Sequence, residues 1–242
     1  MSIGHWDAES VPETDLQTRL ARVLPWLGGV NSIVEVGSGR GQTLRRLAGS
    51  ADLLLGIDLA PELLHQSATA HGEVEHVQAD AQRLPLADDT FDTAIAQEVL
   101  EHVADWSQVL EELFRVARRR VVITVPYQEW LKGLHCPQCG TWARLYDHRH
   151  RFSPETFSLW RHRGRVTIQT IAPPQGLRDY GRKGLRWLAR KSEQGETAMV
   201  RCPECGALFP PELRWKRAID RLWRIISKKP EWLLVVWELE VR

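Results

Sequence analysis

IVEVGSGRG, residues 33–41, is the segment of this 242-residue chain that says most about its architecture. A short β-branched run leads into three glycines at alternate positions, and a helix-compatible segment follows from Gln42. This order predicts a buried strand, a tight turn and a helix N-terminus, where bare backbone can approach a ligand closely. The Gly-x-Gly-x-Gly spacing is one residue shorter than the Gly-x-Gly-x-x-Gly of dinucleotide-binding folds.

Acidic residues close the next two apolar segments. Asp58 ends the second predicted strand, 21 residues beyond Gly37, where a carboxylate can accept both ribose hydroxyls of a nucleoside. Asp80 ends the third and could accept from an adenine amino group, while the Ala81 backbone meets the ring. Residues 91–103 supply a fourth strand and its exit loop. The glycine turn, the two strand-end acids and the fourth strand with its loop follow one another in this order and together predict a nucleoside-binding site.

These motifs, in this order, closely resemble the class I S-adenosylmethionine-dependent methyltransferases. The resemblance is strongest to the small-molecule branch related to the ubiquinone and menaquinone biosynthesis enzymes. It is close over residues 33–126 and loose over the rest of the chain. It implies that S-adenosylmethionine (SAM) is the cofactor and that the chain is an enzyme.

The resemblance also implies a role for each motif residue. Glu35 would hold the methionine ammonium group, Asp58 the ribose, and Gln97 would border the cofactor and the substrate entrance. The loop beside the methionine moiety is implied to comprise Gly37, Ser38, Gly39 and Gly41. The residues implied to lie at the adenine are Leu59, Asp80 and Ala81.

Strands and helices alternate along the chain, which predicts a Rossmann-like, doubly wound parallel sheet of the α/β class. Helices are expected over residues 12–26, 42–49, 61–71 and 105–117. Strands are expected over 33–36, 53–57, 74–79, 91–96, 120–125, 166–171 and 233–241. The resemblance implies that the last two are the sixth and seventh strands and that the seventh is antiparallel. We expect this last strand to form a C-terminal edge.

Four cysteines form two Cys-Pro-x-Cys-Gly motifs, at 136–140 and 202–206, and 62 residues separate Cys139 from Cys202. Each motif predicts a turn that points two thiolates at one position, with glycine allowing the strained backbone after it. Four thiolates make a closed tetrahedral site, so we predict one structural zinc ion. Its ligands would be Cys136, Cys139, Cys202 and Cys205. Two redox disulfides, or separate sites completed by His135, His148 or His150, are the alternatives.

The expected domain organisation follows from these motifs. Residues 1–130 are the SAM-binding core with its N-terminal helix, 153–172 continue that core, and 231–242 add its last strand. Residues 131–152 and 173–230 are the two zinc-knuckle insertions. Both should leave the carboxyl edge of the sheet, where ligands bind in open α/β folds, so we predict that a zinc clasp scaffolds a lid over the substrate entrance.

The second insertion is basic, with 14 Lys and Arg against 6 Asp and Glu between residues 173 and 230. Residues 211–229 predict a basic amphipathic helix, whose charges can be a solvated face, a site for a phosphate-linked or lipid-linked glycan, or a nucleic-acid site. Trp130, Trp142 and Trp160 could line a sugar or aromatic pocket.

Catalysis needs in-line positioning of the acceptor, and an alcohol acceptor also benefits from a general base. His102, at the exit of the fourth strand, is the first candidate, and a helix-start histidine bonded to local backbone is the alternative. His148, in a Tyr-Asp-His-Arg-His cluster, is the second candidate, and a zinc-flanking or surface cluster is its alternative.

Composition limits the remaining choices. A net charge of +1 favours neither a polyanion binder nor an acidic scaffold, and we see no signal peptide or segment that could cross a bilayer. We expect a cytoplasmic methyltransferase acting on a small-molecule or glycan-like hydroxyl in a biosynthetic pathway. The alternatives are an RNA methyltransferase and a non-catalytic SAM-binding subunit. The sequence leaves open whether the protein contacts a membrane surface and which oligomeric state it has.

Overall fold

The computed structural model describes residues 13–70, 74–128, 133–140, 142–144, 148–172, 200–202, 205–209 and 230–240. The chain divides into two compact units. The first comprises Met1–Glu129, Arg149–Ile171 and Pro230–Arg242, and the second comprises Trp130–His148 and Ala172–Lys229.

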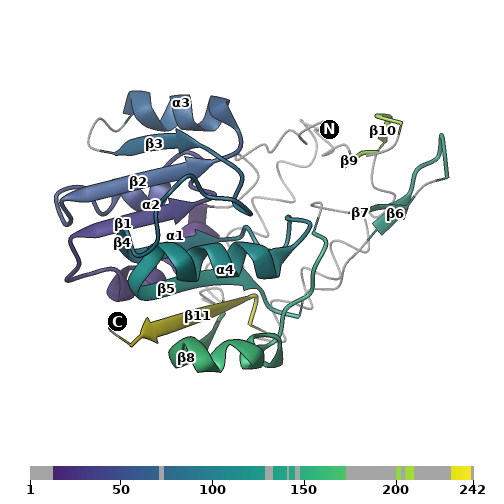
Figure 1. The fold of residues 1–242 in the computed structure, drawn as a ribbon. Helices are drawn as coiled ribbons and strands as arrows, with labels where there is room; N and C mark the ends of the chain where they lie inside the picture. The colour runs from purple at the N-terminus through teal and green to yellow at the C-terminus, as the bar shows by residue number, and fades with distance from the viewer. Residues whose placement is uncertain are drawn as a thin grey trace, which may run out of the picture. The chain divides into compact units, whose positions relative to one another are not determined.

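The first unit is built on a seven-stranded sheet with the order β3-β2-β1-β4-β5-β11-β8 (Figure 1). Five parallel strands form one side of it: β1 (Ser32–Val36), β2 (Leu53–Asp58), β3 (Glu75–Gln78), β4 (Phe91–Gln97) and β5 (Ala117–Pro126). The sheet is completed by β8 (Gly164–Ile171) and β11 (Trp232–Leu239), and β11 runs antiparallel to both β5 and β8. The Rossmann-like α/β fold with an antiparallel seventh strand is therefore confirmed.

The expected place of the last strand is wrong. β11 does not form an edge but lies between β5 and β8, so the edge strands are β3 and β8. Burial is the physical reason: residues 232–237 are all buried, which an edge strand seldom permits, whereas most of β8 is half-buried or exposed.

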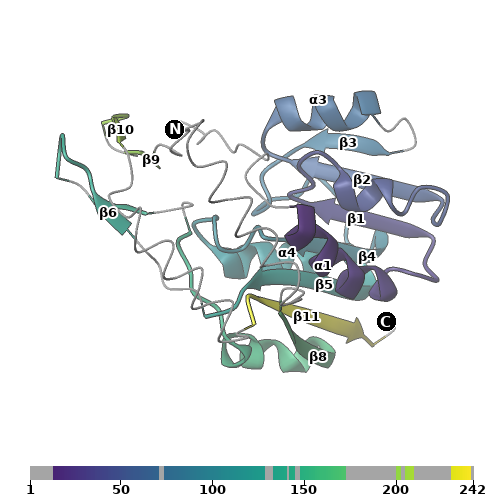
Figure 2. The same ribbon diagram turned by 180° about the vertical axis from the view of Figure 1, so that it is seen from behind.

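Helices cover both faces of this sheet. α4 (Trp106–Val116) and the 3-10 helix η4 (Pro154–Arg163) pack on one face, with Leu113 and Phe114 in the core (Figure 1). α1 (Glu13–Val23), the 3-10 turn η2 (Leu24–Trp26) and α2 (Gln42–Arg45) contribute to the core on the other face (Figure 2). α3 (Pro61–Ala70) contacts β2 and β3. The helix expected over 42–49 is shorter, because turns replace it after Arg45.

Trp160 is a core residue and does not line a pocket. Its ring stacks on Phe114 with a centroid separation of 5.6 Å, and its backbone carbonyl accepts from the Trp237 indole N–H at 3.1 Å. The pocket role suggested for Trp160 is therefore wrong.

The second unit shows two short hairpins. β6 (Gly133–His135) pairs with β7 (Trp142–Arg144), and β9 (Val200–Arg201) pairs with β10 (Leu208–Phe209), both antiparallel. The predicted basic helix at 211–229 lies outside the described residues, as do Trp130, Tyr146 and Asp147. Within the described ranges, no helix has the length and apolar character needed to cross a bilayer.

Candidate functional site

The glycine loop is held against the end of β2. The backbone N–H groups of Gly37 and Ser38 both donate to the Ile57 carbonyl, at 2.7 and 3.0 Å. Gly37 has φ of +71°, and a Cβ there would come within 2.3 Å of a Val99 methyl carbon. A side chain at this position would therefore clash as well as strain the backbone, so the tight approach of the loop requires glycine.

Asp58 ties the loop to the start of the next connection. One of its carboxylate oxygens accepts from the Gly39 N–H at 2.8 Å, and the other accepts from the Ala60 N–H at 2.9 Å. The half-buried carboxylate therefore fixes the glycine loop from the tip of β2. Two lone pairs of the carboxylate remain, and they could accept hydrogen bonds from the hydroxyl groups of a ligand.

Glu35 is a buried carboxylate at the carboxyl end of β1. The Gln97 amide nitrogen donates to Glu35 Oε1 at 2.9 Å and to Thr43 Oγ1 at 2.7 Å, so Gln97 fixes the orientation of Glu35. Burial raises the pKa of Glu35 to about 7, although hydrogen bonds with Thr43 and Gln97 and the charge of Arg19 oppose the rise. Near neutral pH this carboxyl is poised between its two protonation states.

Glu35 Oε2 is buried and, among the described residues, has no hydrogen-bond partner. An ionised carboxylate oxygen in that state is costly unless a cation or donor meets it. The ammonium group of SAM is such a donor, so the residues present fit that cofactor.

The residues predicted at the adenine are accessible. Leu59 is 49% exposed, an unusual fraction for a large apolar side chain that directly follows a buried strand. Asp80 is exposed and accepts from the Gln82 N–H at 2.9 Å, while Ala81 is half-buried. These three positions could meet an aromatic ring, and their roles stay predictions.

Sequence reasoning missed a second polar group at this edge. Arg19 on α1 forms an ion pair with Glu98, with Nη1 and Oε2 3.2 Å apart. The Thr124 hydroxyl on β5 donates to the other Glu98 oxygen at 3.2 Å. A signal for Arg19 was present in the sequence, because it interrupts the apolar stripe of Leu16, Leu20 and Val23 on the leading helix.

His102 lies in the loop after β4, with its Nε2 3.9 Å from an oxygen of the fully buried Glu101. The Glu101 carbonyl accepts from the Arg149 N–H at 2.6 Å, and the His150 Nε2–H donates to the Val103 carbonyl at 2.8 Å. This loop is therefore held in place from residues 149–150. His102 belongs to the first unit and His148 to the second. The catalytic roles of both histidines stay predictions.

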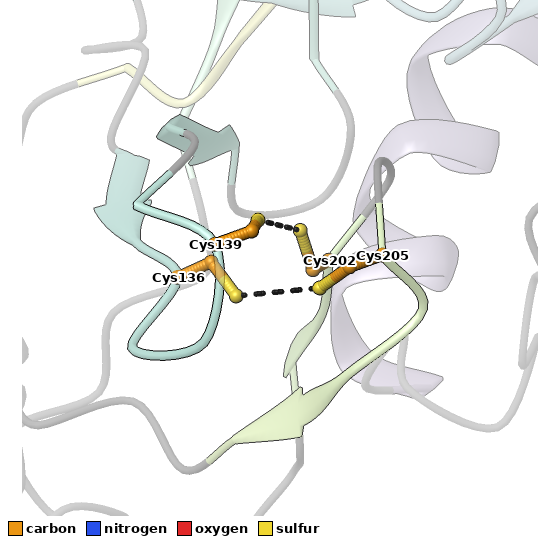
Figure 3. Close-up of side chains that lie close together, drawn as sticks. All are labelled: Cys136, Cys139, Cys202 and Cys205. Atoms are coloured by element: carbon orange, nitrogen blue, oxygen red, sulfur yellow. Dashed lines mark hydrogen bonds between the residues drawn. The ribbon is translucent and has the colours of Figure 1, made fainter.

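The second unit brings its four cysteines together at the turns of the two hairpins (Figure 3). Their sulfurs all lie within 4.8 Å of one another. Cys136 Sγ is 3.7 Å from Cys205 Sγ, and Cys139 Sγ is 3.6 Å from Cys202 Sγ. The glycines that follow the motifs, Gly140 and Gly206, have φ of +73° and +72°.

This cluster fits a tetrahedral zinc site. Zn–S bonds of about 2.3 Å place neighbouring sulfurs about 3.8 Å apart, close to the separations of 3.7 Å between Cys136 and Cys205 and 3.6 Å between Cys139 and Cys202. No disulfide joins any two of these four described cysteines, and the two sulfur contacts at 3.6 and 3.7 Å each join one motif to the other. The Ala207 backbone lowers the pKa of Cys205, but desolvation and the neighbouring thiols outweigh it and raise that pKa to about 12. A cation is what such a set of thiols needs in order to ionise together.

Comparison with known proteins supports the fold. The family model described as a methyltransferase domain matches residues 34–125. The chain is 32% identical over 126 residues to the 27-O-demethylrifamycin SV methyltransferase of Amycolatopsis mediterranei, covering 48% of this chain and 46% of that protein. It is 30% identical over 146 residues to the malonyl-[acyl-carrier protein] O-methyltransferase of Pseudescherichia vulneris, covering 58% of each.

The chain thus spans about half the length of the curated relatives it matches. An S-adenosylmethionine-dependent methyltransferase from Mesorhizobium loti has a similar structure, with a TM-score of 0.56 at 18% identity over 91% of this chain and 95% of that one. With the sheet order and the glycine loop, these matches show that residues 34–125 form a methyltransferase domain with the fold of S-adenosylmethionine-dependent methyltransferases.

Proposed function

We propose that this protein transfers a methyl group from SAM to an oxygen of a small-molecule or glycan-like acceptor. The observation that carries the proposal is the buried Glu35 carboxylate, whose Oε2 has no partner in the described part of the chain. It lies on the strand that leads directly into the glycine loop, and that loop is fixed by Asp58. These two carboxylates at one edge of the sheet support the proposal, because one could meet the ammonium of SAM and the other its ribose.

The residues of the chain would divide the work as follows. Glu35 would neutralise the ammonium, Gln97 would hold Glu35 in place, and Asp58 would accept from the ribose. The loop residues that would lie along the methionine moiety are Gly37, Ser38, Gly39 and Gly41, and those at the adenine are Leu59, Asp80 and Ala81. When bound, SAM supplies the electrophilic methyl group of its sulfonium.

His102 would accept the proton that the acceptor hydroxyl loses. Its imidazole is 19% exposed and faces the buried Glu101 carboxylate, which would stabilise the imidazolium. His148 is the second candidate for this role.

Two relatives favour an oxygen acceptor, because their names describe O-methylation of malonyl-acyl carrier protein and methylation of a demethylrifamycin. RNA is the alternative acceptor, and it rests on the charge of residues 173–230. A cofactor-binding subunit without catalysis is disfavoured, since a degenerate site would be expected to lose Glu35, Asp58 or the loop.

We also propose that Cys136, Cys139, Cys202 and Cys205 hold one structural zinc ion. The cross-motif sulfur separations of 3.6 and 3.7 Å support a single shared site. The predicted lid role of this clasp, the domain boundaries and a cytoplasmic location remain proposals.

Replacing Asp58 tests the cofactor assignment. Asp58→Ala should remove two hydrogen bonds to the ribose and also free the Gly39 and Ala60 N–H groups that now bond to this carboxylate. Bonds to a charged acceptor contribute about 1.5–3 kcal/mol each, so affinity for S-adenosylhomocysteine should fall at least about tenfold. The measurement is calorimetric titration, with Asp52→Ala at an exposed position near the start of β2 as the matched control. Unchanged affinity in Asp58→Ala would remove Asp58 from the site.

A nuclease and salt series tests the acceptor. With a small acceptor, methyl transfer to fractionated extract should survive nuclease treatment and fall when Arg214, Arg217, Arg221 and Arg224 are reversed together. If the acceptor is RNA, the logarithm of the affinity for RNA should instead fall linearly with the logarithm of the salt concentration, because binding releases counterions. Methyl incorporation that disappears with ribonuclease would overturn the small-molecule choice.

A further inference from the structure

The connection between β3 and β4 is long and irregular for a doubly wound sheet. Residues 79–90 contain no helix or strand, although β3 and β4 lie parallel in one sheet and such a crossover ordinarily contains a helix. Asp89, near the end of this loop, has φ of +51°, an uncommon conformation for any residue but glycine. Irregular connections of this length usually serve a function. This one begins with Asp80 and Ala81, two of the residues predicted at the adenine.

An ion pair on α4 holds the middle of this loop by its backbone. Arg115 Nη1 donates to the Leu86 carbonyl at 2.7 Å, and Nη2 donates to the Leu84 carbonyl at 3.2 Å. Glu112 Oε2 accepts from the Leu84 N–H at 2.7 Å. The two side chains also bond to each other, because Arg115 Nε and Nη2 donate to the Glu112 oxygens at 2.7 and 2.8 Å. The Glu112–Arg115 pair therefore binds both backbone groups of Leu84.

The Glu112 carboxylate is ionised and shielded from water. It is 9% exposed, and hydrogen bonds from Arg115 lower its pKa although burial opposes them. Stability alone is a weak reason for such a pair, because well-packed apolar residues often replace a buried ion pair without loss. Apolar side chains could not bind the backbone of a loop in this way. The specific contribution of the pair is therefore the position of the loop.

The start of the loop is held by α4 as well. Gln82 Oε1 accepts from the Asp105 N–H at 2.9 Å, at the N-cap of α4. The Gln82 N–H in turn donates to Asp80 Oδ1 at 2.9 Å, and the Arg83 N–H donates to the Asp80 carbonyl at 3.0 Å. The orientation of the Asp80 carboxylate thus depends on a turn that is bound to opposite ends of α4 through Gln82 and Leu84.

We propose that Glu112 and Arg115 are positioning residues that set the nucleobase specificity of the cofactor site. By fixing residues 80–84, they place the Asp80 carboxylate where it accepts from the 6-amino group of adenine. Hypoxanthine has a carbonyl oxygen at that position and offers no donor there, and a site built around a hydrogen bond rejects the ligand that lacks it. This inference rests on the proposed function and deepens it, because it explains why the site would select an aminopurine.

The ratio of two affinities measures this effect. S-adenosylhomocysteine carries an amino group at position 6 of its purine, and S-inosylhomocysteine carries an oxygen there. Calorimetry on the wild-type protein should show tighter binding of S-adenosylhomocysteine by about ten- to a hundredfold, the range for a hydrogen bond to a charged acceptor. Arg115→Met should reduce this affinity ratio to below about threefold, mainly through weaker binding of S-adenosylhomocysteine. Asp80→Ala should do the same by removing the carboxylate itself.

Arg115→Met leaves the Glu112 carboxylate buried without its cation, so a second variant is needed. Glu112→Gln/Arg115→Met removes both charges and should show the same loss, with thermal melting to establish that it is folded. Arg115→Lys keeps the charge but not the planar fork of donors, so it should give an intermediate ratio. The matched control is Glu111→Gln/Arg163→Met, which makes the same two changes in the ion pair that joins α4 to η4. It should keep the wild-type ratio.

A wild-type ratio in Arg115→Met and in Glu112→Gln/Arg115→Met, with a loss only in Asp80→Ala, would overturn the inference and leave the pair as an anchor of the loop. An equal loss in the matched control would also overturn it, because any weakening of α4 would then suffice. Wild-type protein that binds both ligands equally would overturn it while leaving a cofactor site in place. Wild-type protein that binds neither ligand would overturn the proposed function and this inference with it.

Discussion

Chelation of zinc is expected to unfold the unit that carries the four cysteines while the seven-stranded sheet stays folded. Structural zinc sites of this kind contribute about 10–16 kcal/mol of apparent binding free energy, more than a small unit can replace by packing. The predicted cofactor residues all belong to the first unit, so S-adenosylhomocysteine binding should persist after chelation.

Elemental analysis of the native protein should find one zinc ion per chain. Hydrogen exchange with and without a strong chelator should show lost protection in residues 133–144 and 200–209, and retained protection in β1, β4 and β5. Cys136→Ser should reproduce the effect of the chelator, whereas Ser153→Ala, outside the cluster, should not. Two zinc ions per chain, or a native disulfide between Cys136 and Cys139, would contradict this assignment.

Replacing Glu35 should change the free energy of unfolding and the affinity for the cofactor in opposite directions. The pKa of Glu35 is about 7 in the folded protein against 4.5 for the ordinary carboxyl, so the folded state binds more protons in the range between these values. Stability contributed by this group is therefore present below about pH 4.5 and is lost as the pH rises through 7. At pH 8.5 the ionised, buried Glu35 carboxylate should lower the free energy of unfolding by about 3 kcal/mol.

Glu35→Gln should remove that cost, so the free energy of unfolding in urea should rise at pH 8.5 and change little at pH 5. The same variant should lose about a hundredfold or more in affinity for S-adenosylhomocysteine, because its ammonium would face a neutral amide. Wild-type affinity should increase from pH 5.5 to 7.5, and the variant should lack this dependence. A variant that binds normally at pH 7.5 would exclude Glu35 as the ammonium site.

The sheet was predictable from sequence because its strands are short apolar runs bounded by turn residues. Residues 33–36, 53–57 and 91–96 each lie within an observed strand, since buried parallel strands are rich in apolar residues. The position of β11 was not predictable in this way. An apolar run such as WLLVVW at 232–237 fits any buried strand, and only pairing with both β5 and β8 selects the interior position.

The candidate site was predictable where it consists of backbone motifs and less so where it consists of tertiary contacts. Glu35, Asp58 and the glycine loop are contiguous with their strands, and the structure brings them to one edge. Thr43 lies on α2, Arg19 lies on α1 and Glu98 directly follows β4, so their contacts become visible only when α1 and α2 pack on the sheet. A charged residue in the apolar stripe of a helix is the one local sign that such a contact exists.

The interior position of β11 also constrains how the chain can fold as it is synthesised. β5 ends at Pro126 and its partner begins at Trp232, so roughly one hundred residues must leave the ribosome before that pairing can form. At about 5–20 residues per second, the hydrogen-bonding edge of β5 waits for about 5–20 s, and β8 waits as well once it is made, because β11 is its only neighbour among the described strands. Nascent chains that end before Trp232 therefore expose an apolar strand edge, the kind of surface that chaperones capture and that otherwise promotes aggregation.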